Sequence, residues 1–324
     1  MPGETGTDIT RAARLIREGG LVAFPTETVY GLGTDALDEN AVARVFEAKN
    51  RPTFDPLIVH VYDVAQLADL VTEIPQAAQK LIERFWPGPL TLVLPKTERV
   101  PDLVTAGLPT VGVRIPDHSL ALELLREADV PVAAPSANRF GCISPTTAEH
   151  VAEQLGETVD YILDGGPCRV GVESTVLRVS VSSIPVMLRP GGVSWEDIEA
   201  VIGPIKQPAA TPEADESAQP SPGMLIRHYA PQTPLEIERS PVFRNSRASE
   251  RVGLLAFTPH PQAEQFAVVE TLSPSGDLVE AAAGFFAALR RLDAADLYRI
   301  IATPFPEQGL GRALNDRLQR AATS

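Results

Sequence analysis

Three segments place cations beside a proline or glycine turn, where they can bind an anion. Lys49 and Arg51 end a predicted helix in AKNRP, and Arg189 precedes the glycines of RPGG. Arg114 lies in the apolar run TVGVRIP, where an unpaired guanidinium is costly, so it requires either an internal carboxylate or the carboxylate of a substrate. Lys49 and Arg51 also suit a simpler interpretation, in which each stabilises the dipole of its helix by about 0.3–1 kcal/mol.

Hydroxyl groups gather in four further motifs that follow predicted strands or precede predicted helices. Thr28 lies in PTETVYG, Ser136 and Asn138 in PSAN, Ser144 in SPTT and Ser174 in EST. Open α/β sheets bind ligands at the carboxyl ends of strands, and helix N-termini bind phosphates. The same residue types also make turns and helix caps, and we expect Ser144 to be the N-cap of the next helix. The motifs therefore predict either a polar ligand site or a set of caps and turns.

The segment GLGTDA at residues 31–36 matches the dinucleotide fingerprint G-x-G-x-x-A, but its position argues against that function. Six residues separate it from the preceding strand, and the next helix begins only near Asp38. We therefore expect neither a nicotinamide nor a flavin cofactor. The sequence has no G-x-x-x-x-G-K-[ST] loop, so side chains must hold any nucleotide. Cys142 and Cys168 fit no disulfide framework and no zinc spacing, which predicts a reducing compartment and no zinc.

The composition is that of a folded chain of about two domains. It has 324 residues, with 42 acidic against 28 basic side chains and a formal net charge of -14. This charge disfavours binding to a nucleic-acid backbone unless the basic residues are gathered on one face. The N-terminal segment lacks the apolar core of a signal peptide, and no apolar run approaches the roughly 18–20 residues that span a bilayer. We therefore expect a cytoplasmic protein.

The elements that must position these residues alternate between strands and helices, as in an α/β fold. Apolar runs predict strands at residues 21–24, 56–61, 90–94, 111–115, 131–134, 161–163 and 176–179. Helical periodicity predicts helices at residues 8–18, 39–49, 64–71, 76–85, 119–127, 146–155 and 196–202. Several connections are too short or too rich in proline for a uniform series of parallel crossovers. We therefore expect a twisted mixed sheet with flanking helices.

A polar segment rich in proline divides the chain into two predicted domains. KQPAATPEADESAQPSPG has little to bury, so we assign residues 206–231 to a linker between domains at 1–205 and 232–324. Strands near residues 252–257 and 297–302, with helices near 278–292 and 310–321, predict a smaller α/β domain of Rossmann-like type.

Taken in order, the motifs resemble the threonylcarbamoyl-AMP synthase family, whose catalytic domain is of the YrdC type. The resemblance rests on PTETVYGLG, KNRPxxxPL followed by IVH, TVGVRIP, PSAN, SPT, EST and RPG, and it covers nearly all of residues 8–205. SPGMLIRHYAP after the linker and NDRLQRAA near the C-terminus resemble the longer, two-domain branch of this family.

The resemblance implies a nucleotidyltransferase that makes threonylcarbamoyl-AMP and pyrophosphate from L-threonine, bicarbonate or CO₂, and ATP. It implies Mg²⁺ with ATP as substrate. The product supplies the threonylcarbamoyl group that a downstream transferase complex places on adenosine beside the anticodon of tRNA. Direct binding of tRNA by this chain is expected to be weak, and no membrane partner is expected.

The resemblance also assigns residues to the two larger substrates. L-threonine is placed against Thr28, His60, Arg114, the backbone of Ala134, and Ser174. ATP is placed against Lys49, Arg51, Asp55, Thr110, Ser136, Asn138, Ser144, Arg189 and Tyr229. No covalent nucleophile is implied, because orienting the reactants can lower a barrier by as much as about 7–11 kcal/mol. His60 either orients the threonine amine or accepts its proton.

Three positions depart from the family pattern. Asn50 stands where glycine is usual, Asp55 where asparagine is expected, and Arg139-Phe140-Gly141 replace small residues after PSAN. Asp55 would place a carboxylate near the nucleotide.

Two alternative functions are an RNA-binding module and a carbamoyl transferase, and a separate hypothesis concerns a lid over the nucleotide. An RNA-binding module would show a basic face with exposed aromatic residues, and a carbamoyl transferase of the hydrogenase-maturation type would carry zinc-finger cysteines; the sequence shows neither. Arg227, His228 and Tyr229 adjoin the linker, so this segment is expected to fold over the nucleotide as a lid.

Overall fold

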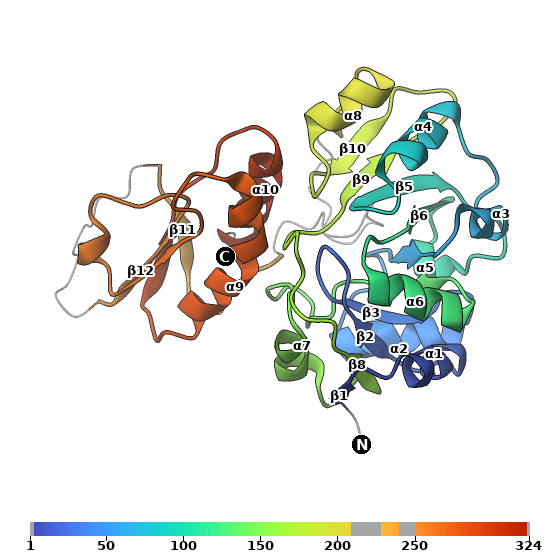
Figure 1. The fold of residues 1–324 in the computed structure, drawn as a ribbon, viewed down its shortest axis with the longest axis horizontal. Coiled ribbons are helices and arrows are strands. Elements are labelled where there is room, and N and C mark those ends of the chain that lie inside the picture. Colours follow the sequence, from blue (N-terminus) through green and yellow to red (C-terminus); the bar gives the residue numbers. More distant parts are fainter. Residues whose placement is uncertain (1–2, 209–227, 240–249, 323–324) are drawn as a thin grey trace.

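The computed structural model describes residues 3–208, 228–239 and 250–322, which form two α/β units (Figure 1). Most of the predicted linker, residues 209–227, and Arg227 of the predicted lid lie outside the described residues. Among the helices that the structure describes, none combines the length and the apolar character that crossing a membrane requires.

The first unit is built on one mixed sheet of ten strands in the order β1-β8-β2-β3-β7-β4-β6-β5-β9-β10. The sheet contains parallel pairs, such as β4 with β6, and antiparallel pairs, such as β5 with β6, which confirms the predicted mixed sheet. The strands are β1 (Glu4–Gly6), β2 (Val22–Phe24), β3 (Gly31–Asp35), β4 (Ile58–His60), β5 (Leu90–Pro95), β6 (Thr110–Arg114), β7 (Val132–Ala133), β8 (Tyr161–Leu163), β9 (Thr175–Arg178) and β10 (Val186–Arg189).

Helices cover the first sheet and bury their apolar faces against it. They are α1 (Ile9–Arg17), α2 (Glu39–Lys49), α3 (Leu67–Leu70), α4 (Gln76–Phe85), α5 (Asp102–Thr105), α6 (Ser119–Ala128), α7 (Ala148–Leu155) and α8 (Trp195–Ile202), with a 3₁₀ turn at Val64–Gln66 before α3. The predicted helix at residues 64–71 is therefore this turn followed by the short α3. Helix α8 packs against α4, and its Ile198 belongs to the main core of the first unit.

The predicted N-cap of α7 is wrong. Thr147 caps this helix, with extended backbone angles and its hydroxyl accepting from the amide of His150. Ser144 lies three residues earlier and donates its hydroxyl hydrogen to Glu173 instead, at 2.5 Å. Ser144 therefore serves the site described below rather than the helix.

The glycine run at residues 31–36 belongs to a strand, β3, that the sequence analysis missed. It pairs antiparallel with β2 and β7 inside the sheet. A side chain at Gly33 would stand 2.7 Å from Phe24 and 2.8 Å from Val132, so close packing between strands accounts for this glycine. This placement agrees with the rejection of a dinucleotide loop.

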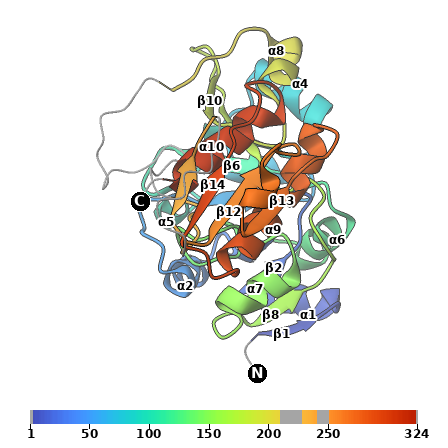
Figure 2. The ribbon, with the colours of Figure 1, turned by 90° about the vertical axis from the view of Figure 1, so that its left-hand side faces the viewer.

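The second unit is a smaller sheet of four parallel strands in the order β11-β14-β12-β13. In Figure 1 its two long helices lie between this sheet and the first unit, and Figure 2 looks at the molecule from the second unit's side. The elements are β11 (Leu235–Ile237), β12 (Val252–Ala256), a 3₁₀ turn (Ala263–Gln265), β13 (Val268–Thr271), α9 (Leu278–Asp293), β14 (Arg299–Ala302) and α10 (Leu310–Ala322). Strands β11 and β13 were not predicted, because each is short and only partly buried.

The two units share one apolar core at their contact. Val29 and Val172 of the first unit belong to the same buried cluster as Phe285 and Phe286 of α9. Gly171 lies directly against α9, since a Cβ there would stand 2.2 Å from the carbonyl oxygen of Ala282. Gly171 also has φ +75°, a left-handed conformation that favours glycine.

We predict that Gly171→Ala destabilises the protein more than Gly107→Ala. Both glycines have φ +75°, so each substitution carries a similar backbone cost of roughly 1–2 kcal/mol, but a Cβ at Gly107 meets no atom within 4 Å. Gly171→Ala must also displace α9, which adds about 1–3 kcal/mol. Denaturant unfolding of the full chain measures both losses, and equal losses would show that the contact with α9 is loose.

Candidate active site

A pocket lies in the first unit, where the carboxyl ends of several strands meet. Two residues of the predicted lid, His228 and Tyr229, also line it. The lining residues are Thr26, Thr28, Val29, Gly31, Arg51, Ile58, His60, Arg114, Ala134, Pro135, Ser136, Glu173, Ser174, Arg189, His228 and Tyr229. This is the position at which open α/β sheets bind ligands.

The structure brings most of the predicted site residues together. All five residues assigned to threonine line the pocket, as do Arg51, Ser136, Arg189 and Tyr229 from the ATP set. Four others are not among the lining residues: Lys49, Asp55, Asn138 and Ser144. Thr110 lines a smaller neighbouring pocket, which shares Ile58 with the first.

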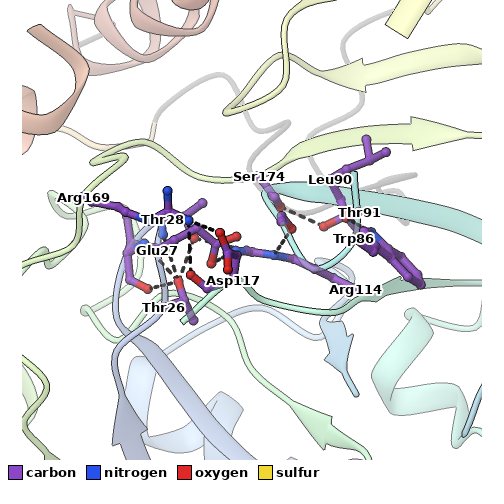
Figure 3. A network of polar contacts seen from close by, with 12 residues as sticks. Thr26, Glu27, Thr28, Trp86, Leu90, Thr91, Arg114, Asp117, Arg169 and Ser174 are labelled. Carbon is purple, nitrogen blue, oxygen red and sulfur yellow. Dashed lines mark hydrogen bonds and ion pairs between the residues drawn. The ribbon is translucent and has the colours of Figure 1, made fainter. Parts of the chain in front are cut away.

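Arg114 extends from the end of β6 towards the PTETVYG segment (Figure 3). Its Nη2 forms an ion pair with Glu27 at 2.5 Å, its Nη1 donates to the Thr28 hydroxyl at 3.1 Å, and its Nε donates to the Gly88 carbonyl at 3.2 Å. Both charged side chains are almost fully buried, with 4% and 0% exposed. Of the two anionic partners that the sequence left open, the internal carboxylate is therefore present.

Ser174 is held on two sides. Its hydroxyl shares a hydrogen bond of 2.8 Å with Thr91, as Figure 3 shows. Arg189 donates from Nε and Nη2 to the Ser174 carbonyl at 3.2 and 3.0 Å, and from Nη2 to the Ser174 hydroxyl at 3.2 Å. Arg189, at the end of β10, thus fixes the segment that carries Ser174.

Lys49 supports the pocket from behind. Its Nζ donates to the carbonyls of Ser136, at 2.6 Å, and Asn138, so it holds the PSAN loop from inside. Burial, with a smaller contribution from Arg51, lowers the pKa of Lys49 well below its ordinary value. The following residue, Asn50, caps α2 in a left-handed conformation with φ 51°, which explains why glycine suits this position and asparagine replaces it.

Asp55 is the internal partner of Arg51. The two side chains form an ion pair at 3.0 Å with 3% and 0% exposed, and Arg51 also donates to the carbonyls of Asp55 and Pro56. Burial raises the pKa of Asp55, although Arg51, Arg189 and Lys49 partly oppose this. The carboxylate that departs from the family pattern therefore neutralises a cation of the pocket wall.

Glu173 is a wall residue that the sequence analysis did not assign. One oxygen accepts from Ser144 at 2.5 Å, and the other accepts from Arg317 of α10 in the second unit at 2.8 Å. Burial opposes its charge, but Arg317, Arg189 and the Ser144 hydroxyl together lower the pKa of Glu173 below its ordinary value. The motif EST contained this residue, but its partner lies 144 positions away.

Several buried polar atoms of the pocket wall lack hydrogen-bond partners among the described residues. They are His60 Nδ1, His228 Nδ1 and the Tyr229 hydroxyl, in three residues that line the pocket. Buried polar groups are nearly always satisfied, so unpaired ones that face a cavity indicate a polar ligand.

The pocket does not offer a built metal site. The structure, over the ranges it describes, contains no group of three or more His, Cys, Asp or Glu that could hold a metal ion. Glu173 is the acidic residue of the pocket lining, and both of its oxygens are engaged by Ser144 and Arg317.

Comparisons with known proteins cover nearly the whole chain. A family model described as telomere recombination matches residues 14–191, and one described as the C-terminal domain of threonylcarbamoyl-AMP synthase matches residues 193–323. The threonylcarbamoyl-AMP synthase of Bacillus subtilis is 48% identical over 97% of this chain and 92% of its own length. That of Pyrococcus abyssi is 46% identical over 96% of this chain and 93% of its own.

The chain belongs to the threonylcarbamoyl-AMP synthase family. The solved structure of P. abyssi Sua5 complexed with L-threonine superimposes with a TM-score of 0.89 at 45% identity, over 98% of this chain and 97% of that one. The family resemblance and the two-part α/β fold expected from the sequence are thereby confirmed. In this member of the threonylcarbamoyl-AMP synthase family, the division into residues 1–205, 206–231 and 232–324 stays a prediction.

His60 is a neutral group in this pocket. Burial, and after it the charge of Arg114, lower the pKa of His60 to about 3. Its ring also meets Phe24 edge-on, with centroids 6.1 Å apart. A neutral imidazole can give or accept one hydrogen bond at each nitrogen, but a pKa near 3 makes it a poor acceptor for a proton from an ammonium group.

We predict that His60→Asn makes stability less sensitive to acid. Above pH 6.5 the histidine is neutral in both states; below it the unfolded chain binds a proton that the folded protein does not, so stability falls as the pH drops towards 3. The substitution should remove up to about 1.4 kcal/mol per pH unit from this slope. Unfolding in denaturant between pH 4 and 7 measures it, and an unchanged slope would contradict a buried neutral His60.

We predict that Glu27→Gln lowers the free energy of unfolding by about 3–5 kcal/mol, because it leaves the guanidinium of Arg114 buried without its counter-charge. The matched control is Asp117→Asn, which breaks the exposed ion pair with Arg169 and should cost less than about 1 kcal/mol. Denaturant unfolding distinguishes the two, and comparable losses would mean that Glu27 is not the partner of Arg114.

Proposed function

We propose that this protein is an L-threonylcarbamoyladenylate synthase, a nucleotidyltransferase that makes threonylcarbamoyl-AMP and pyrophosphate from L-threonine, bicarbonate or CO₂, and ATP. The observation that carries the proposal is one wall of the pocket. Arg114 and His60 lie there side by side at the ends of paired strands β6 and β4, and both line the pocket. Glu27 pairs with the guanidinium of Arg114, and His60 Nδ1 is buried without a partner. A cation and a neutral ring nitrogen suit the carboxylate and the amine of an amino acid.

The threonine site follows from these contacts. Arg114 Nη2 donates to the substrate carboxylate, while Glu27, Thr28 and Gly88 hold the guanidinium in one orientation. His60 orients the amine, because its lowered pKa disfavours taking up the amine's proton. Ser174, fixed by Thr91 and Arg189, supplies a hydroxyl to the same pocket.

The chemistry joins three reactants without a covalent enzyme intermediate. The neutral amine of threonine attacks the carbon of bicarbonate or CO₂ to form a carbamate, with loss of water from bicarbonate. A carbamate oxygen then attacks the α-phosphorus of ATP, and pyrophosphate leaves. Positioning and electrostatic stabilisation supply the catalysis.

The nucleotide side of the pocket is formed by Arg51, Ser136, Arg189 and Tyr229. Lys49, Asp55, Asn138 and Ser144 act on ATP through the wall residues that they contact rather than through direct exposure to the pocket. Thr110 lines the adjoining small pocket, where it can meet a part of the nucleotide that extends past Ile58. Mg²⁺ enters as part of the ATP substrate, held by phosphate oxygens whose charge it neutralises.

The lid hypothesis is supported by the burial of His228 and Tyr229, which are 5% and 1% exposed and line the pocket. Tyr229 packs on Phe286 of α9, and His228 meets Phe140 edge-on. A lid at this position retains the adenylate and excludes water from it.

The product is a mixed anhydride, which is consumed by transfer of its threonylcarbamoyl group to adenosine beside the anticodon of tRNA. We place the protein in the cytoplasm and expect a downstream tRNA threonylcarbamoyl transferase complex to be the recipient. Neither an RNA-binding module nor a carbamoyl transferase accounts for a pocket wall suited to an amino acid.

The deciding experiment measures pyrophosphate release from ATP with Mg²⁺ and bicarbonate. We predict release with L-threonine, much less with L-serine and none without an amino acid, together with a product of the mass of threonylcarbamoyl-AMP. The variant Arg114→Lys keeps the charge but loses the planar fork, so its KM for threonine should rise by at least tenfold. Release that does not depend on the amino acid would contradict the proposal.

A further inference from the structure

Arg317 lies in the middle of α10, in the second unit, yet its side chain reaches the back of the pocket. Its exposed fraction is 0%, and burying an arginine in this way is costly unless its charge is matched. The guanidinium Nε donates to Glu173 at 2.8 Å and Nη1 pairs with Asp316 at 2.5 Å. The centre of the guanidinium lies 5.1 Å from the centroid of the Tyr229 ring, within the range of a cation–π contact.

Both wall residues that Arg317 contacts face the pocket, whereas Arg317 itself does not line it. Glu173 in turn accepts the hydrogen bond of Ser144, and the next residue, Ser174, accepts from Arg189. One guanidinium therefore joins the ring of Tyr229 to the segment that carries Glu173.

An ion pair that only links the two units need not be buried or contact the pocket. Helix α10 also carries an ion pair of this kind. Arg312 pairs with Glu196 of α8 at 2.5 Å, with 33% and 49% of the side chains exposed. An exposed pair of this kind contributes little to stability and touches no pocket residue. Arg317 differs because two of its three partners, Glu173 and Tyr229, line the pocket.

We propose that Arg317 is a positioning residue for the nucleotide, so that the second unit contributes a buried charged side chain to the support of the active site. The inference rests on the proposed function for the identity of the nucleotide. Ser144, Arg189 and Tyr229, which surround the contacts of Arg317, all belong to the residues assigned to ATP. The threonine residues Arg114 and His60 have no contact with it.

The test measures the affinities of full-length variants for ATP with Mg²⁺ and, separately, for L-threonine by titration calorimetry. We expect Arg317→Ala to weaken ATP binding by at least tenfold and threonine binding by less than threefold. Arg317→Lys keeps the charge but loses the fork and much of the ring contact, so it should be intermediate. Arg312→Ala removes the exposed pair on the same helix and should leave both affinities unchanged.

A folding control and a charge-neutral double variant distinguish a loss of ATP binding from a loss of folding. Thermal unfolding of each variant establishes that it is folded, and if Arg317→Ala is not, the double variant Arg317→Met with Glu173→Gln removes both charges together and should still lose ATP affinity selectively. Unchanged ATP affinity in a folded Arg317 variant, or equal losses for ATP and threonine, would overturn the proposal. Because binding is measured directly, wild-type protein that fails to release pyrophosphate with threonine would refute the proposed function and leave the result for Arg317 to stand separately.

Discussion

The pocket depends on the pairing of buried arginines with buried carboxylates. Three buried guanidinium groups lie against three acidic side chains, in the pairs Arg114–Glu27, Arg51–Asp55 and Arg317–Glu173. Without these partners, the loss of hydration would make each buried charge strongly destabilising. Each pair costs desolvation but fixes a planar group in one orientation. A net charge of -14 is thus compatible with binding of anions, because Arg51 and Arg114 are fixed at the cavity by their partners and no general positive field is needed.

The mixed sheet brings these pairs together from distant parts of the sequence. Strand β7 has only two residues, yet it lies between β3 and β4 and places the PSAN loop opposite the PTETVYG segment. Parallel pairing of β4 with β6 sets His60 opposite Arg114 in register. The second unit supports this pocket from outside, since α9 and α10 lie on the side that faces the first unit (Figure 1), and Phe286 and Arg317 pack on the ring of Tyr229.

Much of this arrangement was accessible from the sequence, and what was not has physical causes. Apolar runs and helical periodicity located the buried strands and the longer helices, and the ordered motifs located the pocket. Strand β3 was missed because its glycines reflect close packing, which has no periodic signal. Ser144 resembled a helix cap because spacing cannot distinguish a hydroxyl that caps a helix from one that binds Glu173. The pairing of Glu173 with Arg317 was not predicted for a similar reason. The two residues are 144 positions apart in the sequence, and only the fold makes them neighbours.

A histidine held neutral beside an arginine affects how the proposed reaction depends on pH and on dissolved CO₂. With its pKa near 3, His60 keeps one protonation state across the whole range in which cells operate. The reactants of the proposed reaction do change state there: the amine of threonine must lose a proton before it attacks, and dissolved CO₂ exchanges with bicarbonate. The proposed reaction thus follows the acidity and the carbon dioxide content of its medium through its substrates rather than through His60.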